Sequence, residues 1–278
     1  MFSAFKVACV QNCADDDLEK NIEQTVALTH EAAAAGAKFI CLPEHFSYLA
    51  PNDEQLLKSA FVEEDHPALK RFRGLAAELK VWLLLGSLAI KLPNGRMNNR
   101  SCLLDDRGGI MARYDKLHLF DVSLKAGESY RESATVEAGD IAVIATTPWG
   151  VLGMSVCYDV RFAYLYRQLA QAGAMFLSIP AAFTRTTGRA HWHTLIRARA
   201  IETGSYVFAP AQCGVRRWGR ATFGHSLIVD PWGGVLAEGG DEPCFIIAEV
   251  DAARVDEARR MIPALMHDRP VPPVERRQ

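Results

Sequence analysis

The alternation of short apolar runs with longer amphipathic segments constrains the fold of this chain more than any other feature. The runs typical of β-strands are FKVACVQ (5–11), KFICLPE (38–44), VWLLLGSLAI (81–90), AMFLSIPAAF (174–183) and SYVFAPAQ (205–212). The segments with helical periodicity are 17–35, 66–80, 161–173 and roughly 191–203. This alternation predicts an α/β protein whose helices cover sheets.

Turn residues mark the boundaries of these segments. Aspartates precede the segment 17–35 and predict an N-cap, and Gly36 is placed to end that helix in a left-handed turn. LPNGRMNN (92–99) and DRGG (106–109) predict hairpin loops. Helices and hairpins are mixed without a linker or a repeat, so we expect one domain over 4–255. The proline- and arginine-rich end of the chain predicts a C-terminal extension or tail over 256–278, lying as a surface strap or partly disordered.

Composition excludes several classes of partner. The formal net charge is -2 over 278 residues, so no basic field attracts nucleic acid. The longest apolar run, 81–90, is about half of what a membrane-spanning helix needs. The N-terminus leads directly into a strand without the pattern of a signal peptide. We therefore expect a cytoplasmic protein that binds neither nucleic acid nor a membrane.

The cysteines do not form a recognisable framework. Their number is odd and no CxxC or paired Cys/His spacing occurs among Cys9, Cys13, Cys41, Cys102, Cys157, Cys213 and Cys244. This argues against a disulfide scaffold and a structural zinc site. His191 and His193 are two residues apart and would face different sides of one helix, so they do not predict a metal pair either.

Three reactive side chains stand at the ends of expected strands: Glu44 in FICLPEHF, Lys116 in IMARYDKLHLF and Cys157 in GMSVCYDVRF. Each alone is typical of a solvated charge or a small buried residue. Their common placement indicates a site. The charged segment 117–140 between them is long for a loop in a compact domain, which favours a functional role.

Here the sequence resembles the nitrilase superfamily of carbon-nitrogen hydrolases, from KVACVQ to the strand ending at Val250. The motifs that carry the resemblance are LPE, YDKLHLF, RESAT with Glu132, CYDVRF, HWHTLIRARAIET and GHSLIVDPWG. The segments CYDVRF, TTGRAHW, APAQCG and GHSLIVDPWG look most like the Nit amidases. The resemblance implies a four-layer α-β-β-α sandwich and a Glu-Lys-Cys triad.

The roles implied by the resemblance agree with the chemistry of these residues. A cysteine thiol is only slightly ionised at neutral pH, so a nucleophile needs a base or a cationic neighbour. Cys157 would attack an amide carbonyl, Glu44 would accept the thiol proton, and Lys116 with the backbone N–H of Tyr158 would stabilise the oxyanion. Glu132 would fix Lys116, although it could equally be a plain salt-bridge partner.

The residues expected to bind substrate are Arg161, Phe183 and Thr187. An arginine fork suits a carboxylate, whereas Phe183 could simply be a core aromatic and Thr187 a helix cap. One position departs from the family: Tyr164 stands where glutamate is usual in the motif RFxEL. Specificity or local helix packing could differ as a result.

The resemblance implies an amidase without metal or organic cofactor that forms a homodimer or higher homo-oligomer. We expect it to cleave the terminal amide of a small carboxylate-bearing substrate through a cysteine thioester and to release ammonia. Deaminated glutathione or a similar ω-amide is the favoured substrate. The alternatives are an ω-amidase acting on α-ketoglutaramate, a nitrilase acting on nitriles, and a non-catalytic binding relative.

Overall fold

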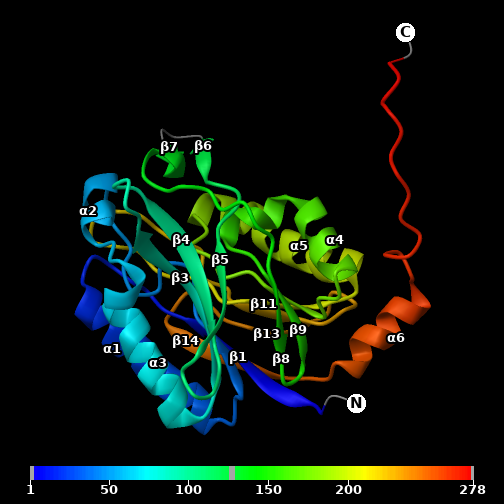
Figure 1. Cartoon of the computed structure of the whole chain (residues 1–278), viewed down its shortest axis with the longest axis horizontal. Helices are drawn as coiled ribbons and strands as arrows, with labels where there is room; N and C mark the ends of the chain where they lie inside the picture. Colours follow the sequence, from blue (N-terminus) through cyan, green and yellow to red (C-terminus); the bar gives the residue numbers. More distant parts are fainter. Residues whose placement is uncertain (1–2, 125–128, 277–278) are drawn as a thin grey trace.

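Two six-stranded sheets pack face to face between two layers of helices (Figure 1). The computed structural model describes residues 3–124 and 129–276. The strand order of the first sheet is β14 (Cys244–Val250), β1 (Phe5–Gln11), β2 (Phe39–Cys41), β3 (Trp82–Lys91), β4 (Met97–Leu104) and β5 (Ile110–Asp115). The order of the second is β13 (Val235–Glu238), β12 (Leu227–Val229), β11 (Tyr206–Ala209), β10 (Phe176–Ser178), β9 (Gly150–Met154) and β8 (Ile144–Thr147). The expected four-layer α-β-β-α sandwich is confirmed.

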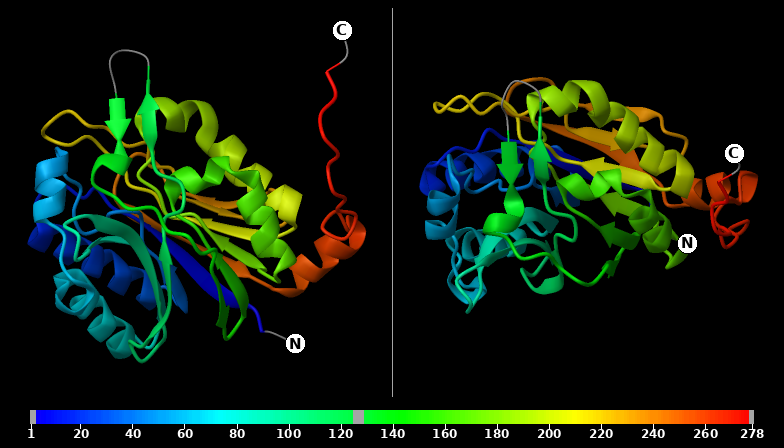
Figure 2. Two further views of the ribbon diagram at one scale, coloured as in Figure 1. Left: turned by 45° about the horizontal axis from the view of Figure 1, so that its top comes forward. Right: turned by 90° about the horizontal axis from the view of Figure 1, so that it is seen from above.

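The helices fall into the two outer layers. Helices α1 (Leu18–Ala34) and α3 (Pro67–Leu79) cover the first sheet, and α4 (Ala163–Gln171) and α5 (Arg185–Thr203) cover the second (Figures 1 and 2). The short helices α2 (Asp53–Lys58) and η1 (Glu63–Asp65) lie between β2 and α3 in the chain. None of the helices in the described part of the chain is long and apolar enough to cross a membrane.

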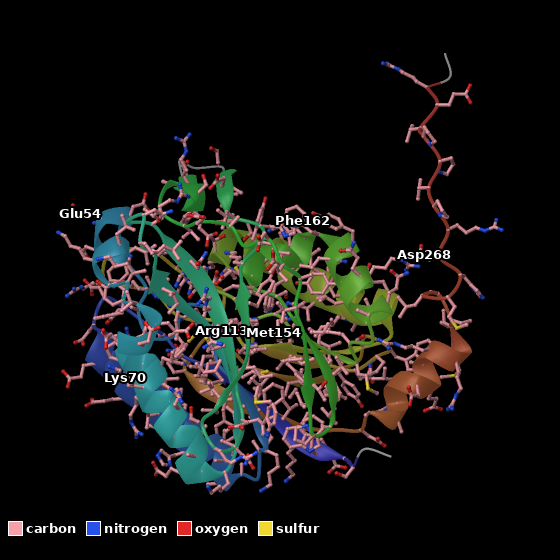
Figure 3. All side chains as sticks on the ribbon, viewed as in Figure 1. Glu54, Lys70, Arg113, Met154, Phe162 and Asp268 are labelled. Atoms are coloured by element: carbon pink, nitrogen blue, oxygen red, sulfur yellow. The ribbon has the colours of Figure 1, made fainter. Side chains whose placement is uncertain are left out.

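Strand periodicity explains how one sheet faces two cores. In β1, Val7 and Cys9 contact the core between the sheets, while Ala8 and Val10 contact the core under α1 and α3. This is the two-residue alternation of a strand that is buried on both faces. Figure 3 places Met154, at the end of β9, in the interior.

Several elements differ from the sequence expectation. Helix α5 begins at Arg185, six residues before the expected start, because the Thr184 side chain accepts a hydrogen bond from Thr187 N and caps it. The glycine in this first turn does not break the helix, since Gly188 packs against Phe223. The hairpin loop expected over 92–99 is shorter, and β4 already begins at Met97. The N-cap is an aspartate, as expected, but it is Asp17, the first residue of the expected helix, rather than an aspartate before it. The expected left-handed turn at Gly36 is confirmed by its φ of 95°.

The segment 117–140 is partly structured. It contains the two-stranded arm β6 (Asp121–Ser123) and β7 (Ser129–Arg131), followed by η3 (Glu132–Ala134). Residues 125–128 of this segment lie outside the described residues. Figure 2 shows the arm extending beyond one end of the sandwich.

The end of the chain consists of a docked part and an extended part. Helix α6 (Ala253–Met261) spans the expected boundary between 255 and 256, and its Val255 and Ala258 are buried. Asp268 still forms an ion pair with Arg167 of α4, with 3.0 Å between Arg167 Nη2 and Asp268 Oδ1. Residues 269–276 are exposed and have no secondary structure. They extend away from the sandwich in Figure 1.

Candidate active site

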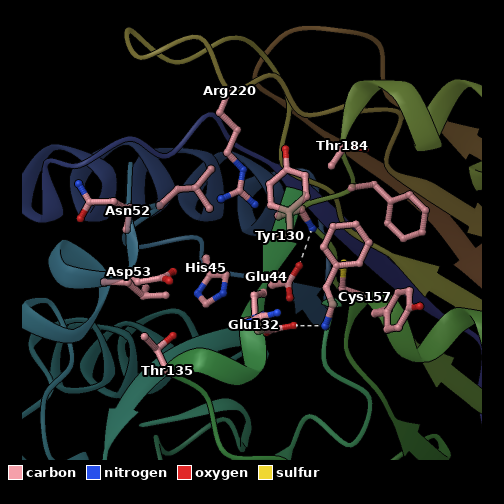
Figure 4. Close-up of a pocket in the computed structure, with 18 of the residues that line it drawn as sticks. Glu44, His45, Asn52, Asp53, Tyr130, Glu132, Thr135, Cys157, Thr184 and Arg220 are labelled. Carbon is pink, nitrogen blue, oxygen red and sulfur yellow. Dashed lines mark hydrogen bonds between the residues drawn. The ribbon is translucent and has the colours of Figure 1, made fainter. Parts of the chain in front are cut away.

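Three strand ends bring Glu44, Lys116 and Cys157 to one cavity. Glu44 follows β2 and Lys116 follows β5 in the first sheet, whereas Cys157 follows β9 in the second. All three line a cavity of about 610 Å³ that also receives residues of the β6–β7 arm (Figure 4). The site therefore forms only where the two sheets meet.

Lys116 lies between two carboxylates. Its Nζ is 2.9 Å from Glu44 Oε1 and 2.8 Å from Glu132 Oε2. The side chain of Asn99 donates to the same carboxylates, at 3.0 Å to Glu44 Oε1 and 3.1 Å to Glu132 Oε1. The backbone N–H of Phe120 donates to Glu132 Oε2 at 2.7 Å. The ammonium and the amide thus hold both carboxylates in fixed positions.

These contacts determine the charge states. Burial by itself raises the pKa of Glu44, but Lys116, His45 and a hydrogen bond from Cys157 outweigh it and lower the pKa to about 2. Burial likewise lowers the pKa of Lys116, but Glu132 and Glu44 raise it well above its ordinary value. The pair is therefore a carboxylate and an ammonium at neutral pH.

Cys157 is held in a strained backbone conformation with its thiol against Glu44. Its φ is 50°, a value that non-glycine residues rarely adopt, and its N–H donates to Pro180 O at 2.8 Å. Burial and the Glu44 carboxylate raise the pKa of the Cys157 thiol well above its ordinary value, against the opposing effect of Lys116. The resting thiol is neutral and donates its hydrogen bond to Glu44.

The Asp159 side chain connects the turn that carries Cys157 to the segment around Lys116. Its Oδ2 accepts from Val156 N at 2.8 Å and from the Tyr114 hydroxyl at 2.6 Å. Its Oδ1 accepts from His118 N at 3.0 Å. In the His118 ring, Nδ1 lies 2.7 Å from Asp159 Oδ1 and Nε2 lies 2.7 Å from the hydroxyl of Tyr164, the residue that departs from the family motif. The exposed Tyr164 therefore contacts Asp159 indirectly, through the His118 ring.

The residues expected to bind substrate do not all reach the cavity. Tyr158, Phe183 and Thr187 line it. Arg161 is not among the lining residues: its Nη1 lies 3.3 Å from His191 Nδ1, and its guanidinium carbon lies 5.4 Å from the centre of the Phe183 ring. The arginine fork that the sequence suggested for a carboxylate thus lies against the rings of Tyr158 and Phe183 and does not line the cavity.

Sequence reasoning missed several side chains of the site. Asn99 lies in a segment that was expected to be a loop, and His45 has a φ of 53° that places its ring in the cavity. Trp218 and Arg220 reach the cavity from a distant segment. Their segment, GVRRWGR (214–220), has no periodicity and no recognised motif, so the sequence offered no signal for these two residues.

Within residues 3–124 and 129–276, two groups of side chains have the geometry to hold a metal ion. The first group is Glu44, His45 and Glu132, and the second is His193, His225 and Glu238. In each group the possible ligand atoms lie within 4.8 Å of one another. In the first group the Lys116 ammonium already binds both carboxylates. In the second, Glu238 Oε1 lies 2.9 Å from His193 Nε2 and 2.8 Å from His225 Nδ1.

Comparison with known proteins agrees with this arrangement. The model of the carbon-nitrogen hydrolase family matches residues 6–260. The chain belongs to the carbon-nitrogen hydrolase family. A deaminated glutathione amidase from Synechocystis is 39% identical over 268 residues, which cover 95% of this chain and 97% of the relative. The mouse deaminated glutathione amidase is 39% identical over 270 residues, covering 95% and 83%.

Solved structures of carbon-nitrogen hydrolases share the fold. The C. elegans NitFhit protein superposes with a TM-score of 0.91 at 38% identity, covering 96% of this chain, which spans only 66% of that fusion protein. An amidase from Nesterenkonia sp. AN1 has a TM-score of 0.77 at 25% identity, covering 92% and 94%. In that structure the acetamide moiety of fluoroacetamide is attached to the active-site cysteine. This carbon-nitrogen hydrolase is accordingly an amidohydrolase.

Proposed function

We propose that this amidohydrolase cleaves its substrate through a thioester on Cys157. The observation that carries the proposal is the contact set of Glu44, which binds both the Cys157 thiol and the Lys116 ammonium. Glu44 accepts the thiol proton as Cys157 Sγ attacks the carbonyl carbon. Lys116 and the backbone N–H of Tyr158 stabilise the oxyanion.

The second half of the reaction uses the same groups. Glu44 gives its proton to the leaving amine as the C–N bond breaks, which leaves the acyl group on Cys157. Water then attacks the thioester, and Glu44 accepts a proton from the water and returns it to the thiolate. Glu132 holds Lys116 in place throughout, because both of its carboxylate oxygens bind the ammonium, at 3.1 and 2.8 Å.

The proposed substrate is deaminated glutathione. Relatives of that name at 37–39% identity in Synechocystis, mouse and human support it. Both amide bonds of glutathione are secondary, so hydrolysis of such a substrate releases an amine. Ammonia is the leaving group only for a primary ω-amide such as α-ketoglutaramate, or for a nitrile.

A substrate panel tests this proposal. The purified chain is incubated with deaminated glutathione, α-ketoglutaramate and an aliphatic nitrile, with free amine and ammonia measured separately. We expect amine release from deaminated glutathione to be fastest and Cys157→Ala to abolish it while the circular dichroism spectrum is retained. Equal amine release by Cys157→Ala would remove the thioester mechanism, and a preference for the primary amide would select the ω-amidase alternative.

We also infer that the chain acts as a homodimer or higher homo-oligomer in the cytoplasm. The exposed apolar side chains of Ile201, Trp232 and Ile262 support association, and all seven cysteines are free, as suits a reducing compartment. Light scattering checks the first inference: a solution mass of 30.7 kDa, that of one chain, would contradict it.

A further inference from the structure

The segment from Cys213 to Phe223 is a tight hairpin that carries three arginines, and each has a different environment. Arg216 is buried, and its Nε donates to Ala14 O at 2.8 Å. Arg217 forms an ion pair with Asp16 on the surface. The hairpin is closed by Arg216 N donating to Arg220 O at 2.9 Å. Arg216 is thus anchored inside the protein, whereas Arg220 reaches the active-site cavity (Figure 4).

Arg220 is a cation without an anionic partner among the described residues. Its guanidinium carbon lies 5.4 Å from the centre of the Tyr130 ring, and its buried Nε has no hydrogen-bond acceptor in the described part of the chain. The carboxylates of Glu44 and Glu132 in the same cavity are already bound by Lys116. Arg220 is half-buried, and its solvent-excluded Nε lacks an acceptor, so an anionic ligand in the cavity would supply the missing partner.

A second donor points to the same ligand. The indole Nε1 of Trp218 is buried, lines the cavity and also lacks an acceptor among the described residues. An arginine fork and a neighbouring N–H donor are a typical pair for one carboxylate.

The position of Arg220 relative to Cys157 identifies which part of the substrate it contacts. In Figure 4, Arg220 lies with His45 and Asn52 on one side of Glu44, and Cys157 lies on the other. The acyl part of the substrate is attached to Cys157, whereas the leaving nitrogen must face Glu44 to receive its proton. The side of the cavity beyond Glu44 therefore receives the leaving amine.

We propose that Arg220, assisted by Trp218, binds a carboxylate on the leaving amine of the substrate. This inference rests on the proposed function and narrows it: the preferred substrates are secondary amides whose amine part is an amino acid or short peptide with a free C-terminus. The leaving dipeptide of deaminated glutathione ends in a glycine carboxylate and fits this class. A primary ω-amide has no group for Arg220 to bind.

The test compares substrates with one acyl group and three leaving groups. The probes are deaminated glutathione, the same compound with its glycine carboxylate converted to an amide, and α-ketoglutaramate. Arg220→Ala should lower kcat/KM for the acid by at least about 30-fold, as expected when an ion pair that the bound substrate covers loses one partner. The other two probes should change by less than about threefold. Arg220→Lys should restore part of the loss, because an ammonium keeps the charge without the fork.

Arg217→Ala is the matched control, because that arginine lies in the same hairpin and pairs with Asp16 outside the cavity. It should leave all three values unchanged. Equal losses for all three probes in Arg220→Ala, with an unchanged melting temperature, would overturn the inference and assign Arg220 to cavity shape. If the unaltered protein hydrolyses none of the probes, the proposed function itself fails, which is a separate outcome.

Discussion

At the scale of single residues, the site keeps its nucleophile neutral until substrate arrives. Two carboxylates share one ammonium, and the thiol beside them has a raised pKa. A free thiolate would add a third negative charge to this buried group. Proton transfer to Glu44 becomes favourable only when the negative charge moves onto a carbonyl oxygen near Lys116 and Tyr158 N. Because Lys116 lowers the pKa of Glu44, the charges of the site also make the stability of the fold depend on pH.

The lowered pKa of Glu44 predicts a loss of stability in acid. An unfolded glutamate has the ordinary pKa of 4.5, so between about pH 4.5 and pH 2 the unfolded chain binds a proton that the folded chain does not. The free energy of unfolding therefore falls as the pH decreases through this window. One such group contributes a slope of up to about 1.4 kcal/mol per pH unit.

Urea denaturation from pH 6 to pH 3 measures this slope, and Glu44→Gln removes the group that titrates. We expect a shallower pH dependence in Glu44→Gln, with a remaining slope from other carboxylates of lowered pKa such as Glu63. Identical slopes in the two proteins would show that Glu44 has an ordinary pKa in the folded state.

At the scale of elements, close contact between neighbouring strands sets the position of Glu44. The turn after β2 runs directly beside Gly86 of β3, where a Cβ atom would lie 1.8 Å from Leu42 O and 2.5 Å from Pro43 O. The register of β3 against β4 shifts between Leu85 and Leu88 at this point. Only a residue without a side chain allows the segment that leads to Glu44 to approach so closely.

Gly86→Ala should therefore impair both stability and activity. We expect a loss of about 1 to 3 kcal/mol in the free energy of unfolding from overpacking, together with a lower kcat because Glu44 is displaced. Gly74→Ala is the matched control: Gly74 is an exposed residue of α3 with nothing within 4 Å of an added Cβ. It should stabilise the protein by about 0.5 to 1 kcal/mol. Unchanged activity in Gly86→Ala would contradict this account of how Glu44 is placed.

Local patterns in the sequence predicted an α/β protein and the three strand-end residues, and the family motifs implied the four-layer sandwich. It did not predict the side chains that join distant segments. Asp159 accepts from His118 across 41 positions, and Arg220 enters the cavity from a hairpin without periodicity. The early start of α5 was missed because threonine and glycine at 186–188 disfavour a helix, and only the Thr184 cap and the packing of Gly188 explain it.

At the scale of the whole molecule, α6 and the residues after it fasten the C-terminal end to the second helical layer. Arg259 Nη2 donates to Ala174 O at 2.6 Å and to Ser205 Oγ at 2.9 Å. Asp268 Oδ2 accepts from Gln171 Nε2 at 2.8 Å. Beyond this contact the described residues are exposed. We therefore propose that the functional unit ends near Asp268.

Two truncations test this boundary. A chain ending at Asp268 should keep its free energy of unfolding within about 0.5 kcal/mol and its kcat unchanged, since it loses only exposed residues. A chain ending at Asp251 loses the buried side chains of α6 and the Arg259 contacts, and should be less stable by at least about 3 kcal/mol. Thermal and urea unfolding measure both, and a large effect of the shorter deletion would move the boundary toward the C-terminus.

A covalent intermediate on Cys157 requires the whole fold, because Cys157 follows a strand of one sheet and Glu44 and Lys116 follow strands of the other. Rapid quenching of the protein with deaminated glutathione in acid, followed by intact mass and peptide mapping, detects it directly. We predict a mass increase equal to the acyl group, located on Cys157, removed by hydroxylamine and absent in Cys157→Ala. An acyl group on any other residue, or amine release by Cys157→Ala at the rate of the unaltered protein, would contradict the mechanism.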